Sequence, residues 1–444
     1  MINLNIKIPE YVSEILSRLK NGGFEAFVVG GCVRDSIMGL SPKDWDITTN
    51  ALPNNTKELF SDLKVIKTGI KHGTVSVITN RKTVEITTYR LDGKYSDNRR
   101  PDSVIFTNEL IEDLSRRDFT VNAMAYNHEK GLVDEFGSLS DLSNKIIRTV
   151  GSPDARFSED GLRIIRAMRF ASVLGFEIEK NTSSSIHRNK CLLKGIAAER
   201  LFSELIKLII GENACRVLLE YGDVLGVFIP AILPTIGLKQ FGEKHCYDVW
   251  EHTCHTIEAI EPQKELRLTM LLHDLGKAPT AQIDENGNST FHNHAQVGAD
   301  IAGNILSDLK SDKKTANSVK RLISFHDFEI PQTEVQVKRM LKSVTPDELR
   351  LLLKIKTADR SALSPAYRDV LQPVTAAEYH LDRIISENIC YNQEGLDVNG
   401  CDIAKEGWKG TQVGKKLDEL LDAVIEGKCG NTRAELLEYL ENRQ

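Results

Sequence analysis

The sequence predicts an α+β protein, with a small mixed β-sheet and helices in its N-terminal part and an all-helical remainder. Short β-rich segments separated by glycine and asparagine cluster between residues 24 and 89. From about residue 155 onward, apolar residues recur at helical spacing through to the end. We therefore expect the architecture to change near residue 150.

The N-terminal elements are bounded by glycine, proline and asparagine, which interrupt helices and strands. We expect an amphipathic helix at 8–22, a buried strand at 24–29, a short helix at 32–40, an acid-bearing strand at 45–49, a helix at 53–63, and β-rich segments at 64–68, 74–78 and 84–89. The polar, turn-rich segment 92–103 is expected to be a mobile loop, a place where function often lies.

The composition is that of an ordinary globular protein, with 41% hydrophobic and 27% charged residues in a chain of 444. No apolar run is long enough to span a bilayer, and the first residues lack a signal-peptide pattern. We therefore expect a cytoplasmic protein with no membrane partner. The eight cysteines form no CxxC pair, which favours reduced thiols over a disulfide framework.

The charge is unevenly distributed along the chain. The net charge of −6 argues against nucleic-acid binding over the whole surface. Residues 148–200, however, carry ten lysines and arginines against six acids, so this segment has a net charge of +4 and the remainder −10. Such a basic stripe is typical of a confined polyanion site, although a solvated helix face explains the same charges.

Asp44 and Asp46 lie one residue apart in the acid-bearing strand. Residues i and i+2 of a strand point to the same face, so both carboxylates would aim at one point. The same alternation makes Glu85 a candidate third carboxylate. Gly30 and Gly31 precede a short helix, where backbone can approach phosphate oxygens. Because Mg²⁺ takes carboxylate ligands together with substrate phosphates, we predict a metal-dependent nucleotidyl-transfer site.

Two further groups of charged residues suit a nucleotide. Arg116, Arg117 and Asp118 run into an apolar helix and fit polyphosphate or sugar contacts, but a surface salt-bridge cluster is equally compatible. A second helix is expected to begin at Ser158 as its N-cap, with acids in the first turn.

On that second helix, Asp160 and Arg163 are i,i+3 neighbours, about 60° apart around the axis. Together they offer acceptors and a donor fork for the Watson–Crick edge of one base. Arg166 and Arg169 lie further round and are expected on phosphate or in structural contacts. Taken alone, an intrahelical salt bridge is the simpler explanation of the Asp160–Arg163 pair.

Five motifs occur together and in order: Gly30-Gly31-Cys32-Val33-Arg34-Asp35, Asp44-Trp45-Asp46, Glu85-Ile86-Thr87-Thr88, Arg116-Arg117-Asp118-Phe119-Thr120-Val121-Asn122-Ala123 and Glu159-Asp160-Gly161-Leu162-Arg163. This set resembles the class II tRNA nucleotidyltransferases, the bacterial CCA-adding enzymes, and their bacterial poly(A) polymerase relatives. The resemblance covers residues 24–170, weakens over 200–240 and resumes towards the C-terminus. It implies a polymerase-β-like nucleotidyltransferase head.

The resemblance implies that Asp44 and Asp46 hold two Mg²⁺ ions, one activating the tRNA 3′-hydroxyl and one bracing the leaving pyrophosphate. Glu85 looks like the supporting carboxylate. For the nucleotide, the resemblance implies that Gly31 and Arg34 bind the triphosphate. It implies that ribose and phosphate are contacted by Arg116, Arg117, Asp118 and Asn122. Asp160 and Arg163, with Arg166 and Arg169 beside them, would select CTP or ATP without a nucleic-acid template. The loop at 92–103 resembles the element that switches from C to A addition. Ser138 departs from the second glycine common after Gly137 in the family.

Histidines and acids also crowd the second half of the chain, and both are ligands for transition metals. Their order resembles the HD metal-dependent phosphohydrolase superfamily. The implied ligands are His252, His273, Asp274 and Asp359, with His294 and His326 at positions for a second metal and Asp274 bridging the two ions. The resemblance leaves Ni²⁺, Mn²⁺, Co²⁺, Fe and Mg²⁺ open. Such a site would hydrolyse 2′,3′-cyclic phosphates or phosphomonoesters at damaged tRNA ends. Histidines that bind nothing are the alternative.

We expect four domains: a catalytic head at 1–149, a neck at 150–215 that recognises the base, a body at 216–370 with the HD site, and a tRNA-binding tail at 371–444. In the tail, Gly410, Gly414, Lys415 and Lys416 form a glycine-rich basic start to a helix at 417–425 that suits phosphate, although a plain helical hairpin is the alternative.

The sequence thus predicts an enzyme that builds or repairs the 3′-CCA end of tRNA from CTP and ATP, releasing pyrophosphate, with a fused HD phosphohydrolase. A poly(A) or A-only polymerase is the first alternative. The second is a hydrolase or RNA-binding regulator whose transferase site is idle. Some HD-containing relatives pair, which leaves a homodimer open.

Overall fold

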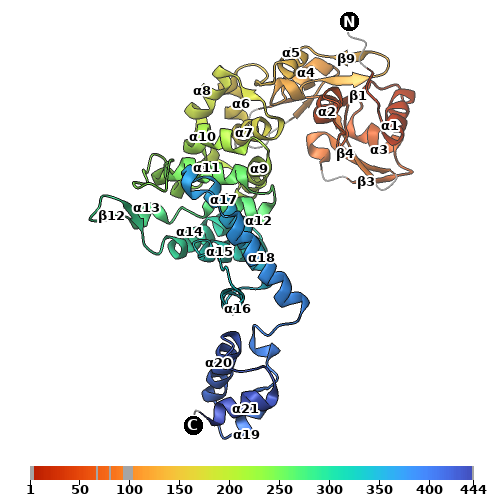
Figure 1. The fold of residues 1–444 in the computed structure, drawn as a ribbon. Helices are drawn as coiled ribbons and strands as arrows, with labels where there is room; N and C mark the ends of the chain where they lie inside the picture. Colours follow the sequence, from red (N-terminus) through yellow and green to blue (C-terminus); the bar gives the residue numbers. More distant parts are fainter. Residues whose placement is uncertain (1–4, 67–68, 80–81, 94–103, 443–444) are drawn as a thin grey trace. The chain divides into compact units, whose positions relative to one another are not determined.

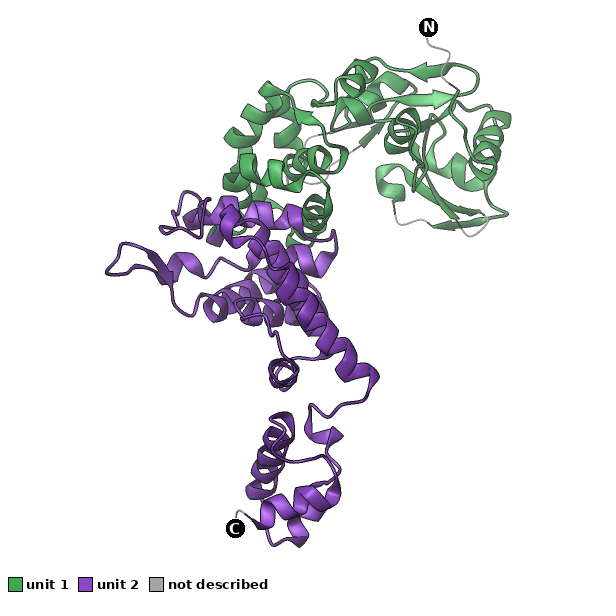
Figure 2. Cartoon of the chain, in the orientation of Figure 1, with its two compact units in different colours: residues 1–230 green, residues 231–444 purple. Residues whose placement is uncertain are grey.

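The computed structural model describes residues 5–66, 69–79, 82–93 and 104–442 (Figure 1). These residues form two compact units, Met1–Pro230 and Ala231–Gln444 (Figure 2). Most of the loop expected at 92–103 lies outside the described residues. Within the described residues, we find no helix with the length and apolar character needed to cross a membrane.

A mixed seven-stranded sheet forms the head of the first unit, as the sequence predicts, in the order β3-β4-β5-β2-β1-β8-β9. Its strands are β1 (Ala26–Val29), β2 (Asp46–Thr49), β3 (Lys64–Ile66), β4 (Thr74–Thr79), β5 (Lys82–Thr88), β8 (Ala125–Asn127) and β9 (Gly131–Val133). β2 and β5 run parallel, with Asp46 opposite Glu85. The neighbouring pairs β1–β2 and β4–β5 are antiparallel. This register brings two acid-bearing strands side by side at the centre of the sheet.

Short helices accompany the sheet: α1 (Glu10–Asn21), α2 (Gly31–Ile37), α3 (Pro53–Leu59), α4 (Leu110–Ser115) and α5 (Ser138–Ser143). α1 buries Val12, Ile15 and Leu19 at the spacing that predicted it. α2 begins directly after Gly30, whose φ of 80° favours glycine, so the turn from β1 into α2 depends on this residue.

The rest of the first unit is mostly helical, with α6 (Pro153–Glu159), α7 (Leu162–Leu174), α8 (Lys180–Asn189), α9 (Ala198–Ile210) and α10 (Ala214–Leu225). Two short strand pairs accompany these elements: β6 (Arg90–Asp92) with β7 (Val104–Phe106), and β10 (Ile146–Ile147) with β11 (Glu177–Ile178), the last within the segment expected to be helical. The expected helix start at Ser158 is wrong, because Ser158 lies inside α6. The chain leaves the helical conformation at Asp160, whose Oδ1 accepts a hydrogen bond from the Leu162 N–H. A Cβ on Gly161 would lie 3.0 Å from the Cβ of Leu192, so the break is closely packed and favours glycine.

The body of the second unit is built from α11 (Val249–Ala259), α12 (Lys264–Leu272), α13 (Lys277–Thr280), α14 (His294–Asp308), α15 (Lys313–Phe325), α16 (Glu334–Leu341), α17 (Pro346–Ser361) and α18 (Leu371–Ser386). One part departs from the all-helical expectation. β12 (Ala281–Ile283) and β13 (Ser289–Phe291) form an antiparallel hairpin between α13 and α14. Its turn contains Gly287, whose φ is 79°.

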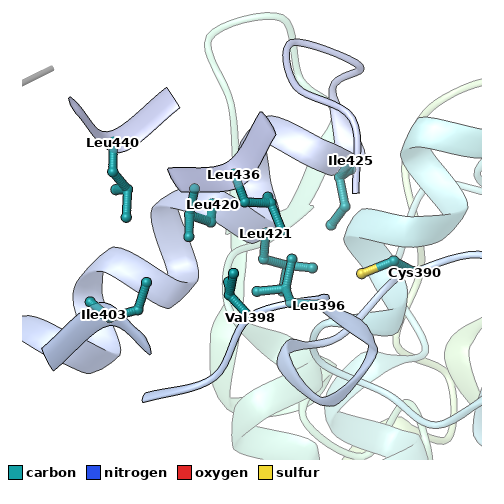
Figure 3. Close-up of a cluster of buried hydrophobic side chains, with 9 residues drawn as sticks. All are labelled: Cys390, Leu396, Val398, Ile403, Leu420, Leu421, Ile425, Leu436 and Leu440. Carbon is teal, nitrogen blue, oxygen red and sulfur yellow. The ribbon is translucent and has the colours of Figure 1, made fainter. Parts of the chain in front are cut away.

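The C-terminal residues pack around an apolar cluster of their own (Figure 3). The helices are α19 (Gly400–Lys405), α20 (Thr411–Ile425) and α21 (Arg433–Glu441). The cluster consists of Cys390, Leu396, Val398, Ile403, Leu420, Leu421, Ile425, Leu436 and Leu440. α20 begins six residues earlier than the helix expected at 417–425, directly after Gly410. By contrast, α18 packs against α16 and α17 of the body.

Candidate active sites

A cavity of about 1110 Å³ in the first unit gathers most of the residues singled out for nucleotidyl transfer. Those that line it are Gly31, Arg34, Asp44, Asp46, Glu85, Arg117, Asp118, Asn122, Arg166 and Arg169. Arg116, Asp160 and Arg163 are not among its lining residues. Carboxylates from the sheet and guanidiniums from the helices therefore share one cavity.

The carboxylates come from two strands and one loop. Asp46 begins β2 and lies opposite Glu85 of β5. The expectation that Asp44 shares the strand is wrong, because β2 starts at Asp46 and Asp44 lies in the preceding loop. Asp46 is accessible from the cavity, but the surrounding protein partly dehydrates it. This dehydration and the charge of Glu85 raise the pKa of Asp46 to about 6.

Three carboxylates lining one cavity fit a divalent cation. Burial raises the pKa of Asp46 most, and the charges of Glu85 and Asp44 add to the shift. Bound Mg²⁺ would take oxygen ligands from this set and remove the repulsion. The donor set is therefore suited to the metal that the sequence predicts.

The raised pKa predicts pH-dependent metal binding. Without metal, the pKa of Asp46 in the folded state is about 6, above the ordinary aspartate value of about 3.9. The protonated side chain therefore stabilises the fold, and this contribution to the free energy of unfolding is lost as the pH rises from about 3.9 to about 6. Metal must displace that proton, so we expect the affinity of the head for Mn²⁺ to fall about tenfold per unit below pH 6 and to level off above it. Calorimetric titrations at several pH values would measure this slope. An affinity that is flat across pH 6 would contradict the expectation.

Three guanidiniums surround one aromatic ring on the other side of the cavity. The guanidinium carbons of Arg34, Arg166 and Arg169 lie 5.3, 5.5 and 4.0 Å from the ring centroid of Phe170. Arg34 also donates a hydrogen bond of 2.6 Å to the Asn122 side chain. Cations held by an aromatic face and by hydrogen bonds are preorganised for phosphate oxygens. Phe170 was not among the residues predicted from the sequence, where its only signal is its position directly after Arg169.

Asp118 connects the head to α7. Its carboxylate accepts hydrogen bonds from Arg166 Nε at 2.9 Å and from the Asn122 side chain at 3.2 Å. Burial alone would raise the pKa of Asp118, but Arg166 outweighs burial and holds the pKa well below its usual range. The carboxylate is therefore ionised throughout the neutral range and fixes Arg166 at the cavity.

Arg116 and Arg117 both pair with Asp113, at 2.7 and 3.4 Å. Asp113 is fully buried, so the cluster is not the surface salt bridge of the alternative interpretation. Arg117 lines the cavity, whereas Arg116 is held at its Asp113 partner.

Asp160 and Arg163 have partners other than each other. Asp160 pairs with Arg200 at 2.9 Å. Arg163 pairs with Glu159 and donates hydrogen bonds to the backbone carbonyls of Arg156, at 3.0 Å, and Arg116, at 3.1 Å. The intrahelical Asp160–Arg163 salt bridge of the alternative interpretation does not form, since Asp160 precedes α7.

The basic segment 148–200 is largely neutralised. Eight of its ten cations form ion pairs with carboxylates: Arg148, Arg156, Arg163, Arg166, Arg169, Arg188, Lys190 and Arg200. Some of these carboxylates, such as Glu204 and Asp223, lie outside the segment. The net charge of the segment therefore overstates its free positive surface.

A second cluster lies in the second unit, where all six residues expected at the HD site converge. They come from α11 (His252), the residues after α12 (His273 and Asp274), the start of α14 (His294), the end of α15 (His326) and α17 (Asp359). The Nε2 atom of His252 lies 2.9 Å from Asp359 and 3.6 Å from Asp274. Asp274 Oδ1 lies 3.8 Å from His294 Nε2 and 3.7 Å from His326 Nε2. Asp274 is thus placed between two groups of imidazoles.

The hydrogen bonds of the four histidines orient them as metal ligands. Each Nδ1 lies at hydrogen-bond distance from a backbone carbonyl, with lengths of 3.3, 2.8, 2.9 and 2.7 Å for His252, His273, His294 and His326. This fixes the proton on Nδ1 and leaves each Nε2 lone pair facing the cluster. Within the described part of the chain, the buried Nε2 of His273 makes no hydrogen bond, although it lies 3.2 Å from Asp274 Oδ2, as expected of an atom placed for a metal. The residues therefore fit a divalent transition metal.

Cations surround this cluster. A cavity of about 280 Å³ is lined by the metal-ligand candidates Asp274, His294, His326 and Asp359 and by Lys244, Lys277, Lys356 and Arg360. Lys277 is buried and bonds Asp274 and Gln240, each at 2.8 Å. The sequence did not indicate a role for these lysines, because their position around the cluster depends on how separate helices pack together.

Three family models match the chain. Residues 26–148 match the "Poly A polymerase head domain", residues 175–232 the "Probable RNA and SrmB- binding site of polymerase A", and residues 242–363 the "HD domain". Among curated relatives, the CCA-adding enzyme of Lactobacillus helveticus is 33% identical over 430 residues, which are 96% of each chain. That of Limosilactobacillus reuteri is 32% identical and covers 98% of this chain and 96% of its own.

Solved structures agree with these relatives. The crystal structure of the Bacillus stearothermophilus CCA-adding enzyme in complex with CTP matches with a TM-score of 0.72 and 30% identity, covering 97% of each chain. The Thermotoga maritima CCA-adding enzyme complexed with tRNA matches with a TM-score of 0.61, covering 100% of this chain and 97% of that one. At 19% identity, this second likeness supports the fold alone.

Proposed function

This chain belongs to the CCA-adding enzymes, and on that premise we propose which of its residues carry the reaction. The enzyme adds the 3′-terminal CCA of tRNA from CTP and ATP without a nucleic-acid template. Relatives at 32 and 33% identity over nearly the whole chain carry this name, which disfavours the poly(A), A-only and idle-transferase alternatives. One observation carries the residue assignment: the carboxylates of Asp44, Asp46 and Glu85 line the same cavity as four guanidiniums, those of Arg34, Arg117, Arg166 and Arg169.

In the proposed reaction, the tRNA 3′-oxygen bonds to the α-phosphorus of CTP or ATP while pyrophosphate leaves. Asp44 and Asp46 hold Mg²⁺, and Glu85 supports Asp46. Mg²⁺ bound there would lower the pKa of the 3′-hydroxyl and neutralise the leaving group. Arg34, Arg166 and Arg169, grouped around Phe170, hold the triphosphate oxygens.

The remaining residues of the motifs position the nucleotide. Asp118 and Asn122 orient Arg166 and Arg34, which supports a role for them in placing phosphate and ribose. Gly31 begins α2, whose N-terminal N–H groups favour anions. Arg117 lines the cavity, while Arg116 stabilises the buried Asp113 beside it.

Asp160 and Arg163 read the base in this proposal. Because their side chains are paired with Arg200 and Glu159, reading a base requires them to exchange these partners. We expect Asp160→Ala and Arg163→Ala to lower the preference for CTP and ATP over UTP and GTP by about tenfold or more, the cost of a lost base contact. Competition assays with all four nucleotides would measure it.

Arg156→Ala is the matched control, because Arg156 also pairs with Glu159. Its nucleotide preference should stay that of the unsubstituted enzyme. If the Asp160 and Arg163 variants melt at lower temperature but keep their preference, both residues are structural. Arg166 and Arg169, which line the cavity, would then be the remaining candidates for selecting the base.

For the second unit, we propose a metal-dependent phosphohydrolase at the HD site. Two overlapping groups, His252 with His273 and Asp359, and His273 with Asp274 and His326, have ligand atoms close enough to hold a metal ion. In this proposal Asp274 bridges the two ions, because it lies near His252 as well as near His294 and His326. The proposed second metal also takes His294. Ni²⁺, Mn²⁺, Co²⁺, Fe and Mg²⁺ are the candidate ions. The lysines around the ligands support an anionic substrate, a phosphomonoester or 2′,3′-cyclic phosphate at an RNA end.

The remaining proposals concern the partners and the setting of the enzyme. We propose binding of CTP and ATP in the head and of tRNA by the neck and tail. A homodimer and a cytoplasmic location stay predictions. Sedimentation of the purified chain would test the first, and fractionation of cells the second.

A further inference from the structure

The buried ammonium of Lys356 lies next to the HD ligands, and it has no individual role in the reaction proposed above. α17 carries it three residues before Asp359, so both side chains lie on one helix face. The side chain is only 9% exposed. Among the residues that the structure describes, its nearest acceptors are the His326 carbonyl at 3.5 Å and the Asp327 carboxylate at 3.7 Å.

These contacts are too weak to compensate a buried charge. A distance of 3.5 Å is at the outer limit of a hydrogen bond. The Asp327 side chain is 60% exposed, so solvent screens the ion pair. The Phe328 ring centroid lies 5.9 Å away, at the edge of cation–π range. A dehydrated ammonium without a close partner is costly and marks a place for an anion.

The other cations of the cavity differ from Lys356. Lys277 contacts Asp274 and Gln240 at 2.8 Å each, so its ammonium already has close partners and positions Asp274, one of the metal-ligand candidates. Arg360 donates to the Tyr367 carbonyl at 3.3 Å, and Lys244 lies exposed at the rim. Lys356 alone among these four is both buried and without a contact shorter than 3.5 Å, as far as the described residues show.

We propose that Lys356 binds a non-bridging phosphate oxygen of the HD substrate, so that the cavity is built for a phosphate group lying between the metal ligands and this ammonium. The inference rests on the phosphohydrolase proposed above and names its substrate-holding residue. Lys356 contacts the substrate and makes no bond to the metals. Phosphomonoesters and cyclic phosphodiesters present the same oxygen, and so does inorganic phosphate, the product of phosphomonoester hydrolysis.

The test compares Lys356→Met with Lys356→Arg in the full-length, Mn²⁺-loaded protein. Methionine keeps the length and removes the charge, whereas arginine keeps the charge. Lys354→Met is the matched control, because Lys354 lies on the same helix but pairs with Glu261 at 2.7 Å. Two readouts are needed: calorimetric binding of inorganic phosphate, and steady-state hydrolysis of p-nitrophenyl phosphate and of 2′,3′-cyclic AMP.

We expect Lys356→Met to weaken phosphate binding and to raise KM for the hydrolysed ester by about ten- to a hundredfold, the value of one charged hydrogen bond. Bound Mn²⁺ should stay unchanged, Lys356→Arg should recover most of the affinity, and Lys354→Met should behave like the unsubstituted protein. The two esters tell which phosphate class the cavity prefers.

The outcomes separate the inference from the proposed function. If phosphate binds and Lys356→Met weakens it while no ester is hydrolysed, the inference stands and the phosphohydrolase does not. If hydrolysis proceeds and Lys356→Met equals Lys354→Met, the inference is overturned and the phosphohydrolase stands. Loss of Mn²⁺ or of folding in Lys356→Met, without recovery by Lys356→Arg, also overturns it, because the lysine would then be structural.

Discussion

Replacing Asp46 with asparagine is expected to reduce nucleotide addition by about a thousandfold or more, because the amide cannot supply the anionic oxygen on which metal-assisted transfer depends. Asparagine keeps the size of the side chain and its place opposite Glu85 in the sheet. It also removes a charge that is partly dehydrated and repelled by Glu85, the two causes that raise the pKa of Asp46, so the fold should be no less stable. Single-turnover incorporation of labelled CTP into a tRNA lacking CCA would measure the loss.

Asp62→Asn is the control for this variant. Asp62 pairs with Arg18 on the exposed side of the head, so its neutralisation should leave the incorporation rate unchanged. A near-normal rate in Asp46→Asn would show that Asp46 does not hold the catalytic metal. Asp44 and Glu85 would then be the remaining candidate metal ligands.

The second large effect is expected at the other site. Asp274 is 2% exposed and lies between the imidazoles of both proposed metal positions. Asp274→Asn should release bound metal and reduce phosphate-ester hydrolysis by at least about a hundredfold, because it removes the ligand that both ions share. Addition of CCA should continue, since the transferase carboxylates belong to the other unit. Metal content by mass spectrometry and the two activities, each assayed on the same preparation, test this.

This variant leaves Lys277 without its carboxylate partner, so folding must be followed separately. His273→Gln provides a second test, because it removes an imidazole that belongs to both groups of metal-ligand candidates. Asp284→Asn, in the turn of the β12–β13 hairpin, is the exposed control. If a folded Asp274→Asn protein keeps its metal and its hydrolysis, the HD assignment fails.

Sequence patterns predicted the parts of the site that depend on local geometry. Alternation along 84–89 identified Glu85, and the parallel pairing of β2 with β5 brings it opposite Asp46. The change from an α+β first half to a mostly helical second half follows from periodicity in the same way, whereas the mixed sheet was implied by the family resemblance. The order of histidines and acids marked six residues that the second unit brings together.

The features that the sequence did not predict depend on distant packing. At the break between α6 and α7, Gly161 packs closely against Leu192, some thirty residues further along. Consequently Asp160 and Arg163 are paired with Arg200 and Glu159, and not with each other. Two further features also depend on tertiary packing: Phe170 lies among three arginines, and Lys356 lies beside the HD ligands. Local periodicity does not predict which buried faces of separate elements pack together.

The 3′-terminal sequence that the enzyme makes on a tRNA ending at the discriminator base tests the central claim most directly. With CTP alone, we predict that addition stops after two C residues. With ATP alone, we predict little product, and with both nucleotides a single CCA end. Runs of A, or the absence of C from the products, would contradict CCA addition and favour a poly(A) or A-only polymerase.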